Sequence, residues 1–330
     1  MKKKIIILTA IVVAAALLVG GTYGALILFQ PFQRDCIVGY GERQPMTNTS
    51  VAPMQLRDDG SFVVLQFTDT HLNNTRGPDA RTLREMEYHT ARVQPDLVVI
   101  TGDLINGRAA QAFISVDRRA ALQAVIDIFA RLNQPWVFVP GNNDHDNFLG
   151  SVHDIVGFLD AYCENIIITR NALIISHPYF SALQHIGAVH FTLPLLDADN
   201  YTAHKLIFMD SLSRFDTLVP EQADWLATQL DYSASIFMHH NTPIFTDLEL
   251  STWPSDRGDV LDELFLHPNV GLVSIGHIHV APTRRATHEG TIFQIGRVSG
   301  YRRGDREPGG VVITITPGAD ELYAFEDFGF

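Results

Sequence analysis

The stretch FVVLQFTDTH, from Phe62 to His71, indicates the fold class because a short apolar run ends directly in polar residues. An apolar run of this length predicts a buried strand over 62–67. Asp69 and His71 follow the strand and are two residues apart. Residues two apart in an extended chain point to the same face, so we expect the two side chains to converge if extended geometry continues past the strand.

The same transition occurs at four further places in the chain. Apolar runs end at Gly102-Asp103, at Gly141-Asn142-Asn143-Asp144, at His239-His240 and at Gly276-His277-Ile278-His279. In open α/β sheets, sites form beyond the carboxyl ends of the strands. We therefore expect five strands to bring Asp, His and Asn side chains to one edge, where they would build a metal site.

Helix-length segments separate many of the apolar runs, which predicts an α/β layered domain. The expected strands are 62–67, 97–101, 136–139, 206–209, 235–238 and 271–275, and the expected helices are 79–93, 110–132, 151–162 and 220–230. The later part is richer in strands, which we place at 188–192, 291–295, 311–315 and 322–325.

The chemistry of the polar residues favours a pair of transition metals. Carboxylate, imidazole and amide groups together suit zinc, manganese or iron rather than calcium. One bridging carboxylate would hold two ions about 3.5–4 Å apart, which is the spacing used for phosphoryl displacement. No cysteine belongs to the set, so a structural zinc finger is excluded. Gly102, Gly141 and Gly276 precede the polar residues, where a sharp turn or a close backbone approach is expected.

Taken in order, these motifs resemble those of the calcineurin-like metallophosphoesterases, and most closely the small purple-acid-phosphatase-like branch. The resemblance covers roughly residues 61–300 and includes Met209-Asp210-Ser211 and the segment 219–226. It implies an α/β fold of the four-layer αββα sandwich type with a dinuclear metal centre at one edge. It also implies a phosphatase or phosphodiesterase that hydrolyses phosphate monoesters or diesters by attack of a metal-bridging hydroxide.

The resemblance assigns metal ligands residue by residue. Two divalent ions, manganese, iron, zinc or similar, would be the cofactors. The first would be held by Asp69, His71 and His279, and the second by Asn142, His239 and His277, with Asp103 bridging.

Two positions depart from the family pattern. Asn143 stands where the family has a histidine that assists the leaving group, and loss of a general acid typically costs about 10²–10⁴ in rate. The alternatives are that His240 or His145 substitutes, that the leaving group needs no help, or that activity is low; of the two histidines, His240 is preferred because it adjoins the expected ligand His239. Asn106 stands where purple enzymes have a tyrosine that ligates ferric iron, so we expect a divalent pair and no purple colour.

The amino terminus has the features of a membrane anchor. Lys2, Lys3 and Lys4 precede 25 uncharged residues, 5–29, and a helix needs about 20 to cross a bilayer. The preceding positive charge predicts a cytoplasmic amino end. We expect a signal-anchor or signal peptide at 1–30, a linker at 31–60 and the metallophosphoesterase catalytic domain at 61–330. That domain would be extracytoplasmic, either membrane-anchored by the N-terminal helix or secreted if the helix is cleaved.

Charge and cysteine content limit the partners. The net charge is −13, although the first 30 residues contain three lysines and no acid. Such an acidic domain would repel phosphate backbones, so we expect a small phosphorylated substrate and no general nucleic-acid binding. Two cysteines, Cys36 and Cys163, exclude a disulfide framework and leave their pairing open.

Two rival functions remain open at this point. One is a phosphodiesterase specific for cyclic nucleotides or phospholipid head groups, which would use the same chemistry. The other is a non-catalytic metal-binding module with the same fold, which the asparagine at position 143 motivates. The sequence leaves the oligomeric state open.

Overall fold

A computed structural model describes residues 52–107, 118–145, 155, 159, 166–167, 173–176, 183–186, 189–213, 216–255, 258–301 and 307–330. The expected anchor at 1–30, both cysteines and nearly all of the expected helix 151–162 lie outside these residues. Within the described part of the chain, no helix has both the length and the apolar character needed to span a bilayer.

A five-stranded sheet, with the order β14-β13-β2-β3-β4, carries the first three polar motifs. β2, β3 and β4 run parallel to one another, and β13 pairs antiparallel with β2. The strands are β2 (Phe62–Phe67), β3 (Leu97–Thr101), β4 (Trp136–Val139), β13 (Gly309–Ile315) and β14 (Tyr323–Gly329). β2, β3 and β4 have the predicted bounds, and their residues are buried throughout, as continuous apolar runs require.

A seven-stranded sheet, with the order β1-β7-β8-β9-β10-β12-β11, carries the histidine motifs. Its strands are β1 (Met54–Gln55), β7 (His190–Leu196), β8 (Thr202–Met209), β9 (Ala234–Phe237), β10 (Val270–Val280), β11 (Arg284–His288) and β12 (Thr291–Arg297). β8, β9, β10 and β12 are parallel neighbours. β1 falls in the expected linker 31–60 and pairs with β7, so this sheet recruits residues that the sequence pattern left irregular.

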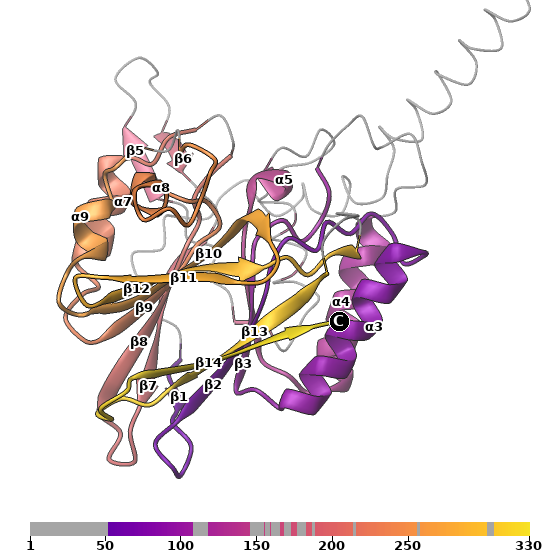
Figure 1. The fold of residues 1–330 in the computed structure, drawn as a ribbon, viewed down its shortest axis with the longest axis horizontal. Helices are drawn as coiled ribbons and strands as arrows, with labels where there is room; N and C mark the ends of the chain where they lie inside the picture. Colours follow the sequence, from indigo (N-terminus) through magenta and orange to yellow (C-terminus); the bar gives the residue numbers. More distant parts are fainter. Residues whose placement is uncertain are drawn as a thin grey trace, which may run out of the picture. The chain divides into compact units, whose positions relative to one another are not determined.

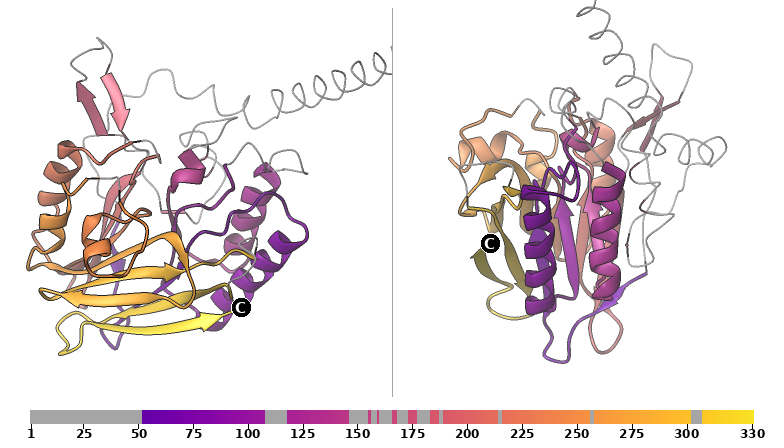
Figure 2. Two further views of the ribbon diagram at one scale, coloured as in Figure 1. Left: turned by 45° about the horizontal axis from the view of Figure 1, so that its top comes forward. Right: turned by 90° about the vertical axis from the view of Figure 1, so that its right-hand side faces the viewer.

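Helices lie on the outer sides of the two sheets (Figure 1). α3 (Pro78–Val93) and α4 (Arg118–Arg131) lie side by side against the five-stranded sheet, and α7 (Pro220–Ala227) and α9 (Asp262–Phe265) lie on the far side of the seven-stranded sheet (Figure 2). Short helices α5 (Asn142–His145) and α8 (Pro243–Asp247) follow β4 and β9, and β5 (Leu173–Ser176) pairs with β6 (Leu183–Ile186). This arrangement matches the expected mixed α/β sandwich.

A buried polar cluster joins the two sheets close to the ends of the motif-bearing strands. Gln66 of β2 accepts hydrogen bonds from Ser274 Oγ of β10 at 2.8 Å and from Gln294 Nε2 of β12 at 2.9 Å. Its own amide donates to Thr101 Oγ1 at 2.9 Å. Because satisfied buried hydrogen bonds are directional, this cluster fixes how one sheet lies on the other. Gln66 therefore explains the one polar interruption in the first apolar run.

Candidate metal centre

Asp69, the first expected ligand, lies directly after β2 and is fully buried. Its Oδ2 accepts hydrogen bonds from the His277 backbone N–H and from Thr68 Oγ1, both at 2.9 Å. Its Oδ1 has no hydrogen-bond donor among the described residues, although it lies 3.1 Å from His279 Nε2 and 3.7 Å from His71 Nε2. Burial would raise the pKa of Asp69, but the charges of His279, His239 and His71 hold that pKa well below its usual range.

A first group of possible ligands forms around this carboxylate. Asp69, His71, Asp103 and His279 each offer one ligand atom, and these atoms lie within 4.8 Å of one another. The Nε2 atoms of His71 and His279 are 3.0 Å apart. Imidazole nitrogens that converge on an unsatisfied, buried carboxylate oxygen are the arrangement that a divalent cation requires. The residues therefore fit a metal ion.

A second group lies on the other side of Asp103 and contains His239, His240 and His277, whose ligand atoms are also within 4.8 Å of one another. His239 Nδ1 lies 2.8 Å from the Thr101 carbonyl oxygen. Donation of the Nδ1 proton to that carbonyl leaves Nε2 as the free ligand atom, which is the usual support for a metal-binding histidine.

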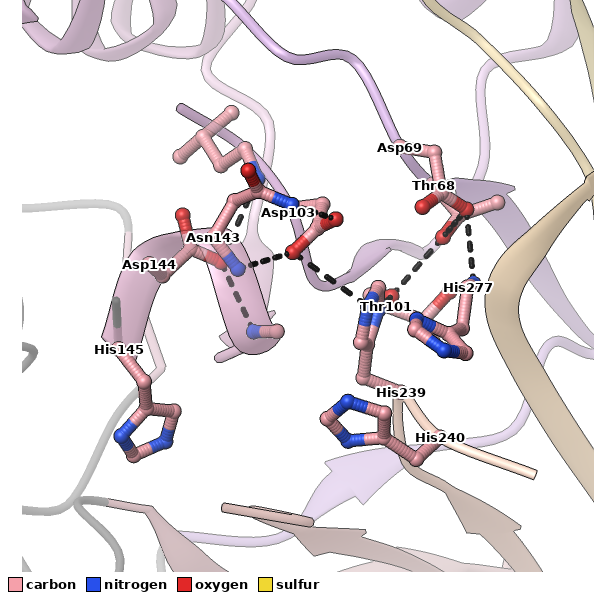
Figure 3. Close-up of polar contacts among 12 residues, drawn as sticks. Thr68, Asp69, Thr101, Asp103, Asn143, Asp144, His145, His239, His240 and His277 are labelled. Atoms are coloured by element: carbon pink, nitrogen blue, oxygen red, sulfur yellow. Dashed lines mark hydrogen bonds and ion pairs between the residues drawn. The ribbon is translucent and has the colours of Figure 1, made fainter. Parts of the chain in front are cut away.

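Asp103 lies close to both groups, and Figure 3 shows it between Asn143 and His239. Its Oδ2 lies 3.5 Å from His71 Nε2, and its Oδ1 lies 3.4 Å from His239 Nε2. Asn143 donates its backbone N–H to Oδ1 at 2.7 Å and its side-chain amide to Oδ2 at 2.6 Å. Burial raises the pKa of Asp103, as does the negative charge of Asp69. A cation in either group would favour the ionised form.

α5 brings the Asn142 motif to the same place. Asp144 fastens this short helix, because its carboxylate accepts the N–H groups of Gly141 at 2.8 Å and Ile105 at 3.1 Å. Asn142 is buried at the start of α5, next to the residue that binds Asp103. All seven expected metal ligands therefore lie at one edge of the two sheets.

The two histidines that could replace the missing acid have different partners. His145 Nε2 lies 2.7 Å from Asp210 Oδ1, while His240 Nδ1 lies 2.9 Å from Ser211 Oγ. Burial alone would lower the pKa of His145, but the Asp210 carboxylate raises it above its ordinary value. His240, unlike His145, also belongs to the second ligand group.

The backbone at several of the expected ligands is not extended. Convergence of Asp69 with His71 was expected on the condition that extended geometry continued past the strand, and that condition is not met. The expected ligands with left-handed backbone are Asp69 (φ 53°), His71 (φ 48°), Asp103 (φ 51°), His277 (φ 70°) and His279 (φ 52°). Such residues cost of order 1–3 kcal/mol each and persist where function requires them. Asp69 and His71 belong to the same ligand group, whereas His277 and His279 belong to different ones.

Neighbouring motifs approach the backbone of Gly141 and Gly276 closely, as expected. A Cβ on Gly141 would overlap the backbone nitrogen and carboxylate of Asp103, and a Cβ on Gly276 would overlap Thr68 Oγ1. Both glycines therefore allow neighbouring motifs to pack against each other at the site.

Asp210 and Ser211 were noticed only as part of a family resemblance, and their partners were missed. They follow β8 directly, as the expected ligands follow their strands, and that position was the available signal. Arg297, a basic residue near the last motif, pairs with Glu307 at 2.9 Å.

Comparison with known proteins identifies the family. The model of the calcineurin-like phosphoesterase family matches residues 62–281, and the chain belongs to this family. Members of the family depend on two metal ions, as the paired ligand groups would require.

Two curated relatives come from a plant and a cyanobacterium. The chain is 29% identical over 121 residues to probable inactive purple acid phosphatase 28 of Arabidopsis thaliana, covering 32% of this chain and 29% of that protein. The chain therefore spans less than a third of the plant protein. It is 26% identical over 234 residues to a probable cyclic nucleotide phosphodiesterase of Synechococcus sp. (strain WH7803), covering 66% of this chain and 74% of that protein.

A solved structure shares the fold. A dimetal phosphatase from Danio rerio superposes with a TM-score of 0.54 at 14% sequence identity. The superposition covers 81% of this chain and 96% of that protein. At this identity the likeness concerns the fold alone.

Proposed function

We propose that this protein is a phosphoesterase with a dinuclear metal centre that hydrolyses phosphate monoesters or diesters. The position of Asp103 carries the proposal. Its two carboxylate oxygens face separate groups of imidazoles, at 3.5 Å and 3.4 Å, as a carboxylate shared by two cations must do. Imidazoles lie on both sides of Asp103, joined on one side by the buried carboxylate of Asp69, and this arrangement supports the same conclusion.

In this proposal, Asp69, His71 and His279 hold one ion, and Asn142, His239 and His277 hold the other, with Asp103 between them. Bound there, two divalent cations would supply an activated water and neutralise charge on the phosphoryl oxygens. Thr101 and Thr68 orient His239 and Asp69, so the ligand atoms are positioned before a cation arrives.

The proton for the leaving group must come from a residue other than Asn143. Both donors of Asn143, its backbone N–H and its amide, are directed at Asp103, which makes it a positioning residue for that carboxylate. We assign the proton to His145, because the charge of Asp210 keeps this imidazole protonated to higher pH.

The test is a metal-loaded preparation assayed against a panel of monoesters and diesters. We expect turnover with manganese or zinc, and two metal ions per chain by metal analysis. Asp103→Ala should lose both the turnover and the bound metal. A fully loaded protein that hydrolyses no member of the panel would overturn the proposal and leave a non-catalytic metal-binding module. The name of the Arabidopsis relative, a probable inactive phosphatase, makes that outcome worth measuring.

A cyclic nucleotide phosphodiesterase is the second candidate. The Synechococcus relative bears that name and matches along 66% of this chain. Hydrolysis of a cyclic nucleotide at a kcat/KM well above that of monoesters would favour it.

We further propose that residues 1–30 anchor the catalytic domain outside the cytoplasm. The lysine cluster followed by 25 uncharged residues supports this placement. Membrane fractionation combined with protease accessibility on intact cells tests it. Recovery of the full-length protein in the cytoplasmic fraction would contradict it.

A further inference from the structure

Trp253 lies beside the metal centre and remains 45% exposed to solvent. Its ring centroid is 5.7 Å from that of His277 and 6.2 Å from that of His279, and both imidazoles meet it edge to face. These two histidines belong to different ligand groups. The indole therefore stands where the two groups meet.

Several hydrogen bonds fix the backbone of Trp253. Its carbonyl oxygen accepts from Ser251 Oγ at 3.0 Å, from Asn241 Nδ2 at 3.2 Å and from Thr246 Oγ1 at 3.3 Å. Its N–H donates to Ser251 Oγ at 3.0 Å. Asn241 directly follows His239-His240, so these bonds fasten the tryptophan to the segment that carries the second ligand group. A backbone held in this way keeps the indole beside the site before a ligand arrives.

Trp253 differs in its chemistry from the other exposed aromatic residues. Among the described residues, the other large hydrophobic side chains that are exposed are tyrosines, at positions 88, 201 and 232, whose hydroxyl groups suit water. Trp136 is fully buried. A large apolar ring left partly open beside charged groups is a surface on which another flat ring can stack.

We propose that Trp253 is the platform for the base of a nucleoside phosphate whose phosphate occupies the metal centre. This inference rests on the proposed function and names its substrate class. In a nucleotide, one sugar separates the base from the phosphate, so a phosphate at the ligand groups places the base near the neighbouring indole. Sugar phosphates and glycerol-based head groups have no aromatic face and would gain nothing from Trp253.

Binding tests the platform without relying on turnover. AMP and ribose 5-phosphate are mixed rapidly with full-length, Mn²⁺-loaded protein while tryptophan fluorescence is recorded. We expect initial quenching by AMP and little by ribose 5-phosphate. Trp253→Phe should keep AMP affinity within about threefold, because phenylalanine also stacks, but should lose the quenching. Tyr201→Ala, which removes an exposed aromatic residue of the β7–β8 turn, should behave like the unchanged protein.

Truncation of Trp253 to alanine measures how much stacking contributes to AMP affinity. Stacking of a base on an aromatic side chain is worth about 1–3 kcal/mol by alanine substitution, so Trp253→Ala should weaken AMP binding roughly 5- to 150-fold. Ribose 5-phosphate binding should change less than about twofold by the same reasoning. The ratio of kcat/KM values for the two esters should fall by the same factor as the ratio of affinities.

Three results would overturn the platform. The first is equal weakening of AMP and ribose 5-phosphate in Trp253→Ala, which would make the indole a structural cover. The second is loss of bound metal in that variant, which would make it a support for the two histidines. The third is equal affinity of the unchanged protein for the two compounds. A protein that binds AMP through Trp253 but hydrolyses no ester would refute the proposed function alone.

Discussion

His145 and Asp210 form a largely buried pair, with Nε2 of the imidazole 2.7 Å from Oδ1 of the carboxylate. The pair joins α5, which follows β4 of one sheet, to the residue that follows β8 of the other sheet. Asp210 Oδ1 also accepts the Leu212 N–H at 2.8 Å, and its carbonyl oxygen accepts Gln222 Nε2 of α7 at 2.9 Å. The pair therefore holds the helix that carries Asn142 and Asn143 against the second sheet.

Replacement of Asp210 by asparagine should destabilise the protein by about 3–5 kcal/mol, the usual cost of breaking a buried ion pair. The loss follows because a buried His145 would keep its desolvation cost without its partner. Equilibrium denaturation measures the effect. The double variant His145→Gln/Asp210→Asn is the control, and its loss should be clearly smaller than the sum of the two single losses. Additive losses would show that the pair does not act as a unit.

The same pair predicts that the folding stability of the protein depends on pH. Asp210 has a lowered pKa, so its contribution is present above its unfolded pKa and is lost as pH falls through the folded value. His145 has a raised pKa, so its contribution is present below its unfolded pKa and is lost as pH rises through the folded value. Asp144 and Asp216 also face His145 and act in the same direction as Asp210, and His190 acts with His145 on Asp210.

We therefore expect the stability difference between the unchanged protein and Asp210→Asn to be largest in mildly acidic to neutral solution. It should shrink towards both acidic and alkaline pH. If His145 is the proton donor, Asp210→Asn should also shift the alkaline limb of the kcat profile to lower pH. An unchanged limb would remove His145 from that role.

The sequence predicts the strands and the ligand-bearing ends because both depend on local pattern. Buried apolar runs form central strands, and the carboxyl ends of parallel strands share one edge. The left-handed backbone at Asp69 and His277 has no local signal, since neither residue is a glycine. The pairing of His145 with Asp210 spans 65 positions, and the site beside Trp253 also depends on chain packing. The first contact forms only when the two sheets come together, and the second only when the loop after α8 packs against β10.

Asp144 gives a prediction for the metal-free protein. Burial raises its pKa to about 8, and the nearby Asp103 adds to the effect. An acid with a raised pKa keeps its proton in the folded state. Its contribution to folding stability is therefore present at low pH and is lost as pH rises from about 4 to 8. The melting temperature of the chelated protein should fall over this range more steeply than that of Asp144→Asn. Added Mn²⁺ should reduce the slope, because a cation favours ionised carboxylates. Identical slopes for the two chelated proteins would contradict the prediction.

Restoration of the family histidine at position 143 should speed hydrolysis of esters with poor leaving groups. A positioned general acid contributes about 10²–10⁴ in rate, and because His145 already supplies a proton in our proposal, Asn143→His should raise kcat on an alkyl phosphate by only about tenfold. The gain on a nitrophenyl ester should be small, because that leaving group departs without a proton. Asn143→Ala is the matched control, since it also removes the 2.6 Å amide bond to Asp103 Oδ2 but adds no acid. It should be slower than the unchanged protein on both esters, because Asp103 loses a donor that orients it. Equal rates for the histidine and alanine variants on the alkyl ester would mean that the missing acid does not limit this protein.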